Sequence, residues 1–307
     1  MTAASVVHVL GNPGHRARGQ TVDAVVATLR ARGVGVEPIV ADSVAASAER
    51  TSAVVRDGAE RVIAVGGDGV VHLAVGAVAR TATVLGIVPD GTGNDVARAL
   101  GLLDGDLDAR IERALADPVE VDAIRSDHGW IASVATLGFS GDVTARANAM
   151  RWPRGQARYT LATLLQLPRL RSIPVTVEVD GQVLTTSSSL LSVGNTAFFG
   201  GGMRICPGAR PTDGVAEVVS IDAVPKRTFL RVFPQVFTGR HVDRPEVRCA
   251  TGRIVRLTGD GADLWADGEL LGPLPVTLET VPGAVRIAGA TLPTDQPTQA
   301  SPAPSGS

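Results

Sequence analysis

The chain has 307 residues, of which 44% are hydrophobic and 20% are charged, as in a folded globular protein. Its 29 basic and 31 acidic residues nearly cancel, so no basic field indicates a nucleic-acid partner. Its two cysteines are too few for a disulfide scaffold or a four-thiolate zinc site. Lys226 is the single lysine, and its neighbours do not form a phosphate-binding loop. This excludes a Walker-type P-loop and the catalytic lysine of protein kinases.

The first third of the chain alternates between β-branched runs and helical periodicity. Strands are predicted at residues 5–10, 34–40, 61–65 and 84–88, each followed by a loop and a helical segment. This repetition predicts a parallel sheet with crossover helices, in which ligands bind beyond the carboxyl ends of the strands.

From about residue 118 short β runs dominate. They are predicted at 118–124, 130–136, 174–179, 184–193, 215–221, 254–257 and 276–278, with helices inserted at 145–170 and 226–237. Asp-Gly turns at 180–181, 213–214 and 267–268 separate several of them. The prediction is an α/β domain over residues 1–118, an antiparallel β domain over 119–292, and a disordered tail over 293–307 that is rich in Pro, Ser and Thr.

Two glycine-rich loops follow the third and fourth predicted strands. The first is Gly66, Gly67, Asp68 and Gly69, and the second is Gly91, Thr92, Gly93, Asn94 and Asp95. Glycines at a strand end bring backbone N–H groups close to an anion, and a following helix adds its positive N-terminus. Either loop alone fits an ordinary strand-to-helix turn, but two at neighbouring strand ends favour a nucleotide site.

Two stretches in the β-rich half carry further polar residues. Residues 200–214 form a long irregular run that begins with three glycines and ends in Asp213-Gly214. Residues 265–269 read Trp-Ala-Asp-Gly-Glu. Each Asp-Gly pair is also an ordinary turn dipeptide, so neither stretch by itself indicates a function.

Taken in order, these four segments resemble the diacylglycerol kinase catalytic family, which includes bacterial soluble lipid kinases and is related to sphingosine kinases. The resemblance extends over about residues 5–292. It implies an NAD kinase/diacylglycerol kinase-like α/β domain, followed by an antiparallel β-sandwich-like domain with inserted helices. Gly-Gly-Asp-Gly also occurs in NAD kinases and phosphofructokinases, whereas the glycine run and Asp267-Gly268-Glu269 are typical of the lipid kinases.

The resemblance implies ATP as phosphoryl donor and Mg²⁺ as metal. Asp267 corresponds to the general base that acts on the lipid hydroxyl, and Asp68 and Asp95 to the acidic network around the catalytic magnesium. A structural magnesium corresponds to Asp213 and the backbone carbonyls of Arg210 and Val215. The contact region for the nucleotide is implied to extend from the first loop to Leu73. The residues implied to bind the nucleotide are Asn12, Gly66, Gly67, Asp68, Gly69, Gly91, Thr92, Gly93, Asn94 and Glu269.

The chain departs from the family pattern at two positions near the first loop. Val70 stands where the family usually has threonine, and Leu73 replaces a common glutamate. Loss of this hydroxyl and carboxylate predicts either an enzyme with altered nucleotide affinity or a regulator that binds nucleotide or lipid without catalysis. The presence of Asp267, which corresponds to the general base, favours the enzyme. His72, between these two positions, is expected on the surface of the helix, and the alternative is contact with phosphate or the lipid headgroup.

The predicted reaction is phosphorylation of diacylglycerol to phosphatidic acid, with a sphingoid base, a monoacylglycerol or a polyprenol as alternative substrates. The predicted partner is a lipid substrate at a membrane surface. We expect a cytosolic protein with reversible membrane contact, because no signal peptide and no run of 18 apolar residues is present. The basic, Leu-rich segment 151–171 suits such contact, and the alternative is a core helix. The helix 229–237 carries three phenylalanines that line either an acyl pocket or the core. The resemblance also suggests a homodimer, because related enzymes are often dimeric, although the sequence shows no dimer interface.

Overall fold

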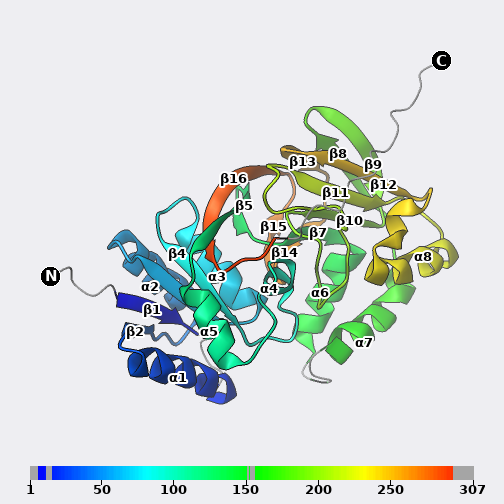
Figure 1. Cartoon of the computed structure of the whole chain (residues 1–307). Helices are drawn as coiled ribbons and strands as arrows, with labels where there is room; N and C mark the ends of the chain where they lie inside the picture. Colours follow the sequence, from blue (N-terminus) through cyan, green and yellow to red (C-terminus); the bar gives the residue numbers. More distant parts are fainter. Residues whose placement is uncertain (1–5, 12–15, 151, 153–155, 293–307) are drawn as a thin grey trace.

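The computed structural model describes residues 6–11, 16–150, 152 and 156–292. Its first third alternates strands and helices (Figure 1): β1 (Val6–Leu10), α1 (Arg16–Ala31), β2 (Gly35–Ile39), α2 (Val44–Arg56), β3 (Arg61–Gly66), α3 (Asp68–Val78), β4 (Val84–Pro89), α4 (Asp95–Ala99) and α5 (Leu107–Leu115). Strands β1 to β4 pair in parallel in the order β2-β1-β3-β4. The predicted parallel sheet is therefore confirmed, and α5 is an additional helix that the sequence analysis did not predict.

The second part is rich in strands. Its elements are β5 (Pro118–Ser126), β6 (Gly129–Ile131), β7 (Val134–Gly138), α6 (Phe139–Ala149), α7 (Gln156–Gln166), η1 (Leu167–Arg169), β8 (Ile173–Val179), β9 (Gln182–Ser188), β10 (Leu190–Gly194), β11 (Ala216–Ile221), α8 (Lys226–Val232), η2 (Phe233–Thr238), η3 (Arg240–Asp243), β12 (Val247–Gly252), β13 (Ile254–Thr258), β14 (Asp263–Ala266), β15 (Glu269–Pro273) and β16 (Val276–Ala288).

Strand β16 joins the two parts of the molecule. It pairs in parallel with β4 and antiparallel with β5 and β13, so one ten-stranded sheet runs from β2 through β16 to β9. Figure 1 shows β16 curving between the N-terminal strands and the C-terminal layer. The sequence analysis predicted only three residues of this 13-residue strand. The parallel strands and part of the β-rich half thus share one sheet.

The other sheet has six strands in the order β12-β11-β10-β7-β14-β15, all antiparallel. It packs on the β-rich part of the first sheet through a shared apolar core that includes Leu137, Val177, Leu191, Val255 and Leu264. This is the predicted sandwich-like arrangement. The strand predicted at 184–193 is in fact two strands, because the chain leaves β9 of the first sheet at Ser189 and enters β10 of the second.

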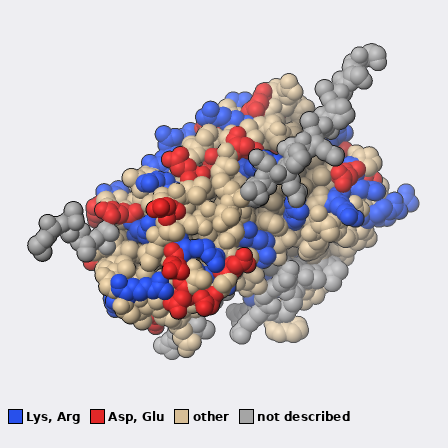
Figure 2. All heavy atoms as spheres, viewed as in Figure 1, with Lys and Arg blue, Asp and Glu red and all other residues tan. Residues whose placement is uncertain are grey.

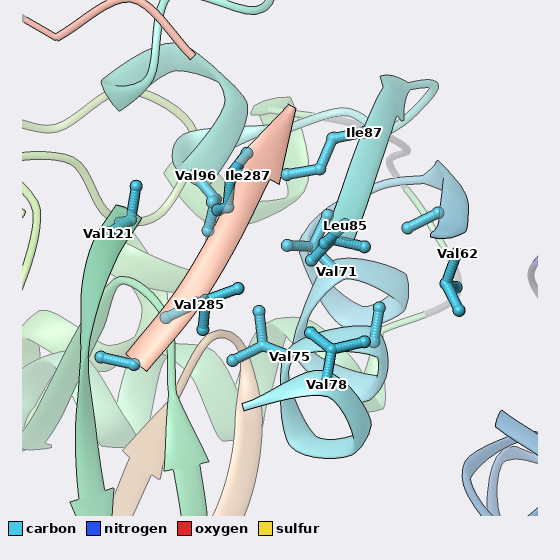
Figure 3. Packing of buried hydrophobic residues seen from close by; sticks show 14 of the residues in the cluster. Val62, Val71, Val75, Val78, Leu85, Ile87, Val96, Val121, Val285 and Ile287 are labelled. Atoms are coloured by element: carbon cyan, nitrogen blue, oxygen red, sulfur yellow. The ribbon is translucent and has the colours of Figure 1, made fainter. Parts of the chain in front are cut away.

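The parallel strands bury both of their faces. On β3, Val62 and Ala64 face the cluster under α2 and α3, whereas Ile63 and Val65 face the cluster under α1 and α5. This alternation follows from the two-residue period of a strand. Figure 3 shows the first cluster, in which valines of α3 lie against β4 and β16. Helices on both faces hold the strand ends, and therefore the loops that follow them, in fixed positions.

Helices α6, α7 and α8 lie together (Figure 1) and pack on the face of the six-stranded sheet opposite to β8 and β13. Phe139 and Phe229 are buried and meet edge to face with ring centroids 4.9 Å apart, and Phe233 stacks on Phe229 at 5.3 Å. The phenylalanines at 229 and 233 therefore belong to the core, while Phe237 is exposed. None of the helices in the described ranges has the length and apolar character needed to cross a bilayer.

Candidate active site

The two glycine loops lie side by side at the carboxyl ends of β3 and β4. Gly66 pairs with Pro89, and the Asp90 N–H donates to the carbonyl of Gly66 at 2.9 Å. An added Cβ on Gly91 would lie 2.4 Å from the Cα of Gly67, so position 91 has no room for a side chain, and a Cβ on Gly67 would lie 3.0 Å from the Cα of Gly91. The neighbouring strand ends thus bring the two loops into direct backbone contact, as the sequence predicts.

Asn94 closes the second loop. Its backbone is left-handed (φ 52°), its Oδ1 accepts from the Gly91 N–H at 2.9 Å, and its Nδ2 donates to the Gly91 carbonyl at 2.9 Å. Both ends of this amide are used inside the loop, whereas Thr92 is exposed. The side chain of Asn94 therefore shapes the loop, and Thr92 is the residue of this loop that faces outward.

Asp68 and Asp95 form a chain of hydrogen bonds across three segments. Asp68 Oδ1 accepts from the N–H groups of Asp95 at 2.7 Å and Val96 at 3.2 Å, at the start of α4. Asp95 in turn accepts from the N–H groups of Gly201 and Gly202, both at 2.8 Å. The glycine run of the β-rich half is thereby fixed to both loops of the first part.

Both carboxylates are hard to ionise in this position. Burial, with the charge of Asp95 next, raises the pKa of Asp68 to about 7. Burial likewise raises the pKa of Asp95, against the hydrogen bonds from the two glycines. Two interacting carboxylates with raised pKa values, one half-buried and one buried, are typical of a site that receives a cation or a proton.

Asp267 lies in the tight turn between β14 and β15. Ala266 pairs with Glu269, and Asp267 and Gly268 both have positive φ (51° and 89°), which is the geometry of a two-residue Asp-Gly hairpin. The turn interpretation and the functional one therefore both apply to this dipeptide. The side chain is fully buried and points to the start of β7, where it accepts from Ala132 and Ser133.

His72 meets Asp267 from the first turns of α3. Its Nδ1 lies 2.9 Å from Asp267 Oδ2, and its side chain is 20% exposed. The expected surface position is therefore wrong, because this histidine is partly buried against the predicted base. Glu269 lies on the same hairpin, with Oε1 3.6 Å from where a Cβ on Gly69 would be. The hairpin thus approaches the first glycine loop.

The structure brings most of the predicted site residues to one place, here called the loop site. It consists of Gly66, Gly67, Asp68, Gly69, His72, Gly91, Thr92, Gly93, Asn94, Asp95, Gly201, Gly202, Asp267 and Glu269. Asn12, predicted to contact the nucleotide, lies outside the described residues.

The predicted ligands of the structural metal lie in the loop before β11. Asp213 is exposed, and its Oδ1 accepts from the Val215 N–H at 3.2 Å, closing a short turn. Arg210 precedes this turn, and its charge acts on Asp213. Metal binding by these three residues stays a prediction.

Asp122 of β5 is a structural carboxylate that the sequence analysis missed. It is buried and accepts from the N–H groups of Gly214 at 2.8 Å and Gly283 at 2.9 Å. It therefore ties the loop before β11 to β16. An aspartate in the middle of an apolar strand was the available signal.

The two departures from the family pattern face the core. Val70 is buried, and a Cβ on Gly66 would lie 2.6 Å from its Cγ2. Leu73 packs on the same apolar cluster. These side chains pack beneath the loop, whereas Gly67, Asp68 and Gly69 are partly exposed.

Comparison with known proteins agrees with this geometry. Residues 6–125 match the family model described as diacylglycerol kinase catalytic domain, and residues 132–289 match the YegS C-terminal NAD kinase beta sandwich-like domain. A protein of Mycobacterium tuberculosis (strain H37Rv) named diacylglycerol kinase is 36% identical over 290 residues, which cover 92% of this chain and 94% of that protein. A Bacillus subtilis protein of the same name is 28% identical and covers 70% and 72%.

Solved structures show the same fold. The crystal structure of a putative diacylglycerol kinase from Bacillus anthracis superposes with a TM-score of 0.75 at 18% identity, covering 92% of this chain and 97% of that one. Yeast NADH kinase gives a TM-score of 0.51 at 11% identity, with coverage of 94% and 81%. With both parts of the sequence matched and a relative at 36% identity over nearly its whole length, the chain belongs to the diacylglycerol kinase family.

Proposed function

We propose that the protein transfers the γ-phosphate of ATP to the hydroxyl of a lipid, with diacylglycerol as the substrate and phosphatidic acid as the product. The observation that carries this proposal is the loop site itself, where two glycine loops, the interacting carboxylates of Asp68 and Asp95, and a hairpin with a third carboxylate converge. Family membership supports ATP as the donor. The names of the relatives support the lipid.

The loops suit a phosphate chain. Gly67 and Gly69 are partly exposed at the N-terminus of α3, an 11-residue helix whose dipole favours negative charge there. Phosphoryl transfer depends mainly on positioning and on neutralising charge, so it does not need a lysine. This agrees with a chain whose single lysine lies on α8.

The donor set fits Mg²⁺. Asp68 Oδ2 receives no hydrogen bond from the described residues. Burial and Asp95 raise the pKa of Asp68 to about 7, and a bound cation would offset this cost of ionising the carboxyl group. Within the described residues no three His, Cys, Asp or Glu side chains are placed to hold a metal alone. Mg²⁺ commonly takes one or two carboxylates together with phosphate oxygens and water. Asp68 and Asp95 would hold it, and it would neutralise phosphate charge.

Contact with a membrane is part of the proposal. The outer face of α8 and η2 exposes Leu230 (49%) and Phe237 (52%) beside Lys226, Arg227 and Arg231. Figure 2 shows basic side chains projecting on the side of the molecule where α8 lies in Figure 1. Exposed apolar side chains with basic side chains beside them suit reversible binding to anionic lipid. Trp152 and Leu165, from the segment predicted for this role, are also exposed.

The variant Asp267→Asn distinguishes the kinase from a non-catalytic binder of the same fold. It should lose lipid phosphorylation and keep ATP binding, whereas Asp263→Asn, an exposed neighbour on β14, should keep both. Turnover by Asp267→Asn at the parent rate would contradict the proposed chemistry. No transfer to any lipid by the parent protein, with ATP bound, would favour the regulator.

Membrane contact is tested separately by flotation with vesicles of phosphatidylglycerol or of phosphatidylcholine. The double variant Leu230→Ser, Phe237→Ser should lose binding to the anionic vesicles. Val44→Ser, which changes an exposed valine on α2 (60%), should retain it. Equal binding of both variants to the anionic vesicles would show that α8 and η2 do not contact the membrane.

A further inference from the structure

The turn between β14 and β15 is held by a helix that lies outside the sheet. Asn148, in the last turn of α6, donates from Nδ2 to the carbonyl of Gly268 at 3.0 Å, across 120 residues of sequence. Gly268 directly follows Asp267 and is the second residue of the turn. Among the described residues Asn148 is the donor to this carbonyl. One side chain of α6 therefore fixes the backbone of the turn that carries Asp267.

Helix α6 reaches the turn because it packs along β14 (Figure 1). A Cβ on Gly141 would lie 2.9 Å from Cδ1 of Trp265, so the helix and the strand approach each other closely at this point. Asn148 follows Gly141 by seven residues, which places both on the same face of the helix, two turns apart. The face of α6 that meets β14 at Trp265 thus carries Asn148 to the turn.

Apolar packing between α6 and β14 is incomplete. A pocket of about 120 Å³ is lined by residues of both elements, among them Gly141, Ala145 and Trp265. Ala145 lies between Gly141 and Asn148 on the same helix face, and its methyl group does not fill this space. The hydrogen bond of Asn148 therefore supplies a contact near the turn that the packing of small side chains does not.

The backbone of the turn determines where the carboxylate of Asp267 lies. Asp267 is left-handed (φ 51°), a conformation that persists where surrounding contacts impose it. Its carboxylate accepts from Ala132 and Ser133 before β7 and from His72 of α3. These donors act on the side chain, to which the lipid hydroxyl must also bond, whereas Asn148 acts on the backbone. The backbone contact can therefore remain while the bonds of the carboxylate rearrange around the substrate.

We propose that Asn148 is a positioning residue of the kinase. Its hydrogen bond to Gly268 holds the β14–β15 turn so that the carboxylate of Asp267 stays within reach of the lipid hydroxyl, as a general base requires. This inference rests on the proposed function and keeps Asp267 as the base. Asn148 acts through the turn, and it needs no contact of its own with the lipid or with ATP.

The location of Asn148 separates positioning from general stability. The residue is exposed, and surface substitutions usually change the free energy of unfolding little. Its hydrogen bond goes to the hairpin and not to either glycine loop, so ATP binding should not depend on it. A displacement of about 1 Å at a reacting group, by contrast, can lower the rate by about 10²-fold. Loss of this bond should therefore appear in kcat.

The test is steady-state kinetics at saturating MgATP and diacylglycerol in mixed micelles, with urea denaturation of each variant. Asn148→Ala removes the donor, so kcat should fall about 10- to 100-fold. The KM for ATP and the midpoint of denaturation should not change. Asn148→Gln keeps an amide donor and should recover most of the lost kcat. Gln182→Ala truncates an exposed amide on β9 and should match the parent.

The outcomes distinguish this inference from the proposed function. Parent-like kcat in Asn148→Ala overturns the inference, and so does a loss of kcat that comes with lower stability and a higher KM for ATP. If the parent transfers no phosphate to any lipid, the proposed function fails and the inference with it. Independently of turnover, the Glu269 N–H shares a peptide unit with the Gly268 carbonyl, so its NMR resonance should shift in Asn148→Ala but not in Gln182→Ala. An unchanged Glu269 resonance would exclude the contact.

Discussion

The contact between the two glycine loops gives the sharpest prediction about the phosphate cradle. In Gly91→Ala the new Cβ would lie 2.4 Å from the Cα of Gly67 and 2.6 Å from Oδ1 of Asn94. Ordinary contacts begin at 3.4 Å, so the loops must separate by about 1 Å. One contact is backbone and the other is an amide already bonded to the loop, so neither can yield by a simple rotation.

The expected cost appears in both stability and catalysis. Overpacking of this kind destabilises a fold by about 1–3 kcal/mol. A displacement of about 1 Å in a positioning loop can lower the rate by about 10²-fold. Gly91→Ala should therefore unfold at lower denaturant concentration and lose kcat/KM for ATP.

Gly76→Ala is the matched control. Gly76 lies in the last turn of α3 with open space around an added Cβ, so the same chemical change should stabilise the protein, by at most about 1 kcal/mol, and leave ATP kinetics unchanged. The assay is urea denaturation of both variants, followed by kcat and KM for ATP. If Gly91→Ala keeps the parent kinetics, the two loops do not form one rigid cradle and the reasoning is refuted.

Three further predictions concern single positions. Val70→Thr restores the usual family residue but places its hydroxyl in the core under Gly66. The free energy of unfolding should therefore fall by about 1–3 kcal/mol, and the KM for ATP should not change. A tenfold lower KM would instead place this side chain at the phosphates. Phe229→Ala removes the centre of the aromatic cluster under α8 and should cost about 3–5 kcal/mol in urea denaturation, and a loss below 1 kcal/mol would contradict that packing. Burial lowers the pKa of His241, which bonds the carbonyl of Ile205, so the unfolded chain binds the proton more readily. The free energy of unfolding should therefore fall as the pH drops through 6.5, and this slope should be smaller in His241→Gln, which keeps a donor but cannot titrate; equal slopes would refute the assignment.

The sequence predicts the parallel half of the fold well because its signals are local. Each strand ends at a glycine loop and each helix follows directly, so order and direction follow from the chain itself. α5 could have been found in the same way, since Asp106 caps it by accepting from the Ala109 N–H and the run that follows has helical periodicity.

The β-rich half is harder to predict because its pairing is not local. Nothing between residues 184 and 193 marks Ser189 as the point where the chain changes sheet, since both flanking runs are good strands. Strand β16 pairs with β4, β5 and β13 at three different sequence separations, and only the folded chain shows that one strand joins the two parts. Strand pattern alone does not determine partners.

The same distinction applies to the site. Asp68, Asp95 and Asp267 were identified from motifs, but the groups that set their chemistry come from distant segments. Ser133 bonds Asp267 across 134 residues, and His72 does so across 195. A histidine after a glycine loop is an ordinary helix residue by sequence. Only the approach of the β14–β15 hairpin gives it a carboxylate partner.

The central claim is that the loop site transfers phosphate from ATP to a lipid alcohol. It is tested most directly by incubating the protein with γ-labelled ATP, Mg²⁺ and mixed micelles that contain diacylglycerol, a monoacylglycerol, a sphingoid base or a polyprenol, and resolving the products by chromatography. The account predicts labelled phosphatidic acid from diacylglycerol, absent without Mg²⁺ and lost in Asp267→Asn. A labelled product from another lipid would change the substrate, whereas no label in any lipid, from protein that binds ATP, would contradict the account.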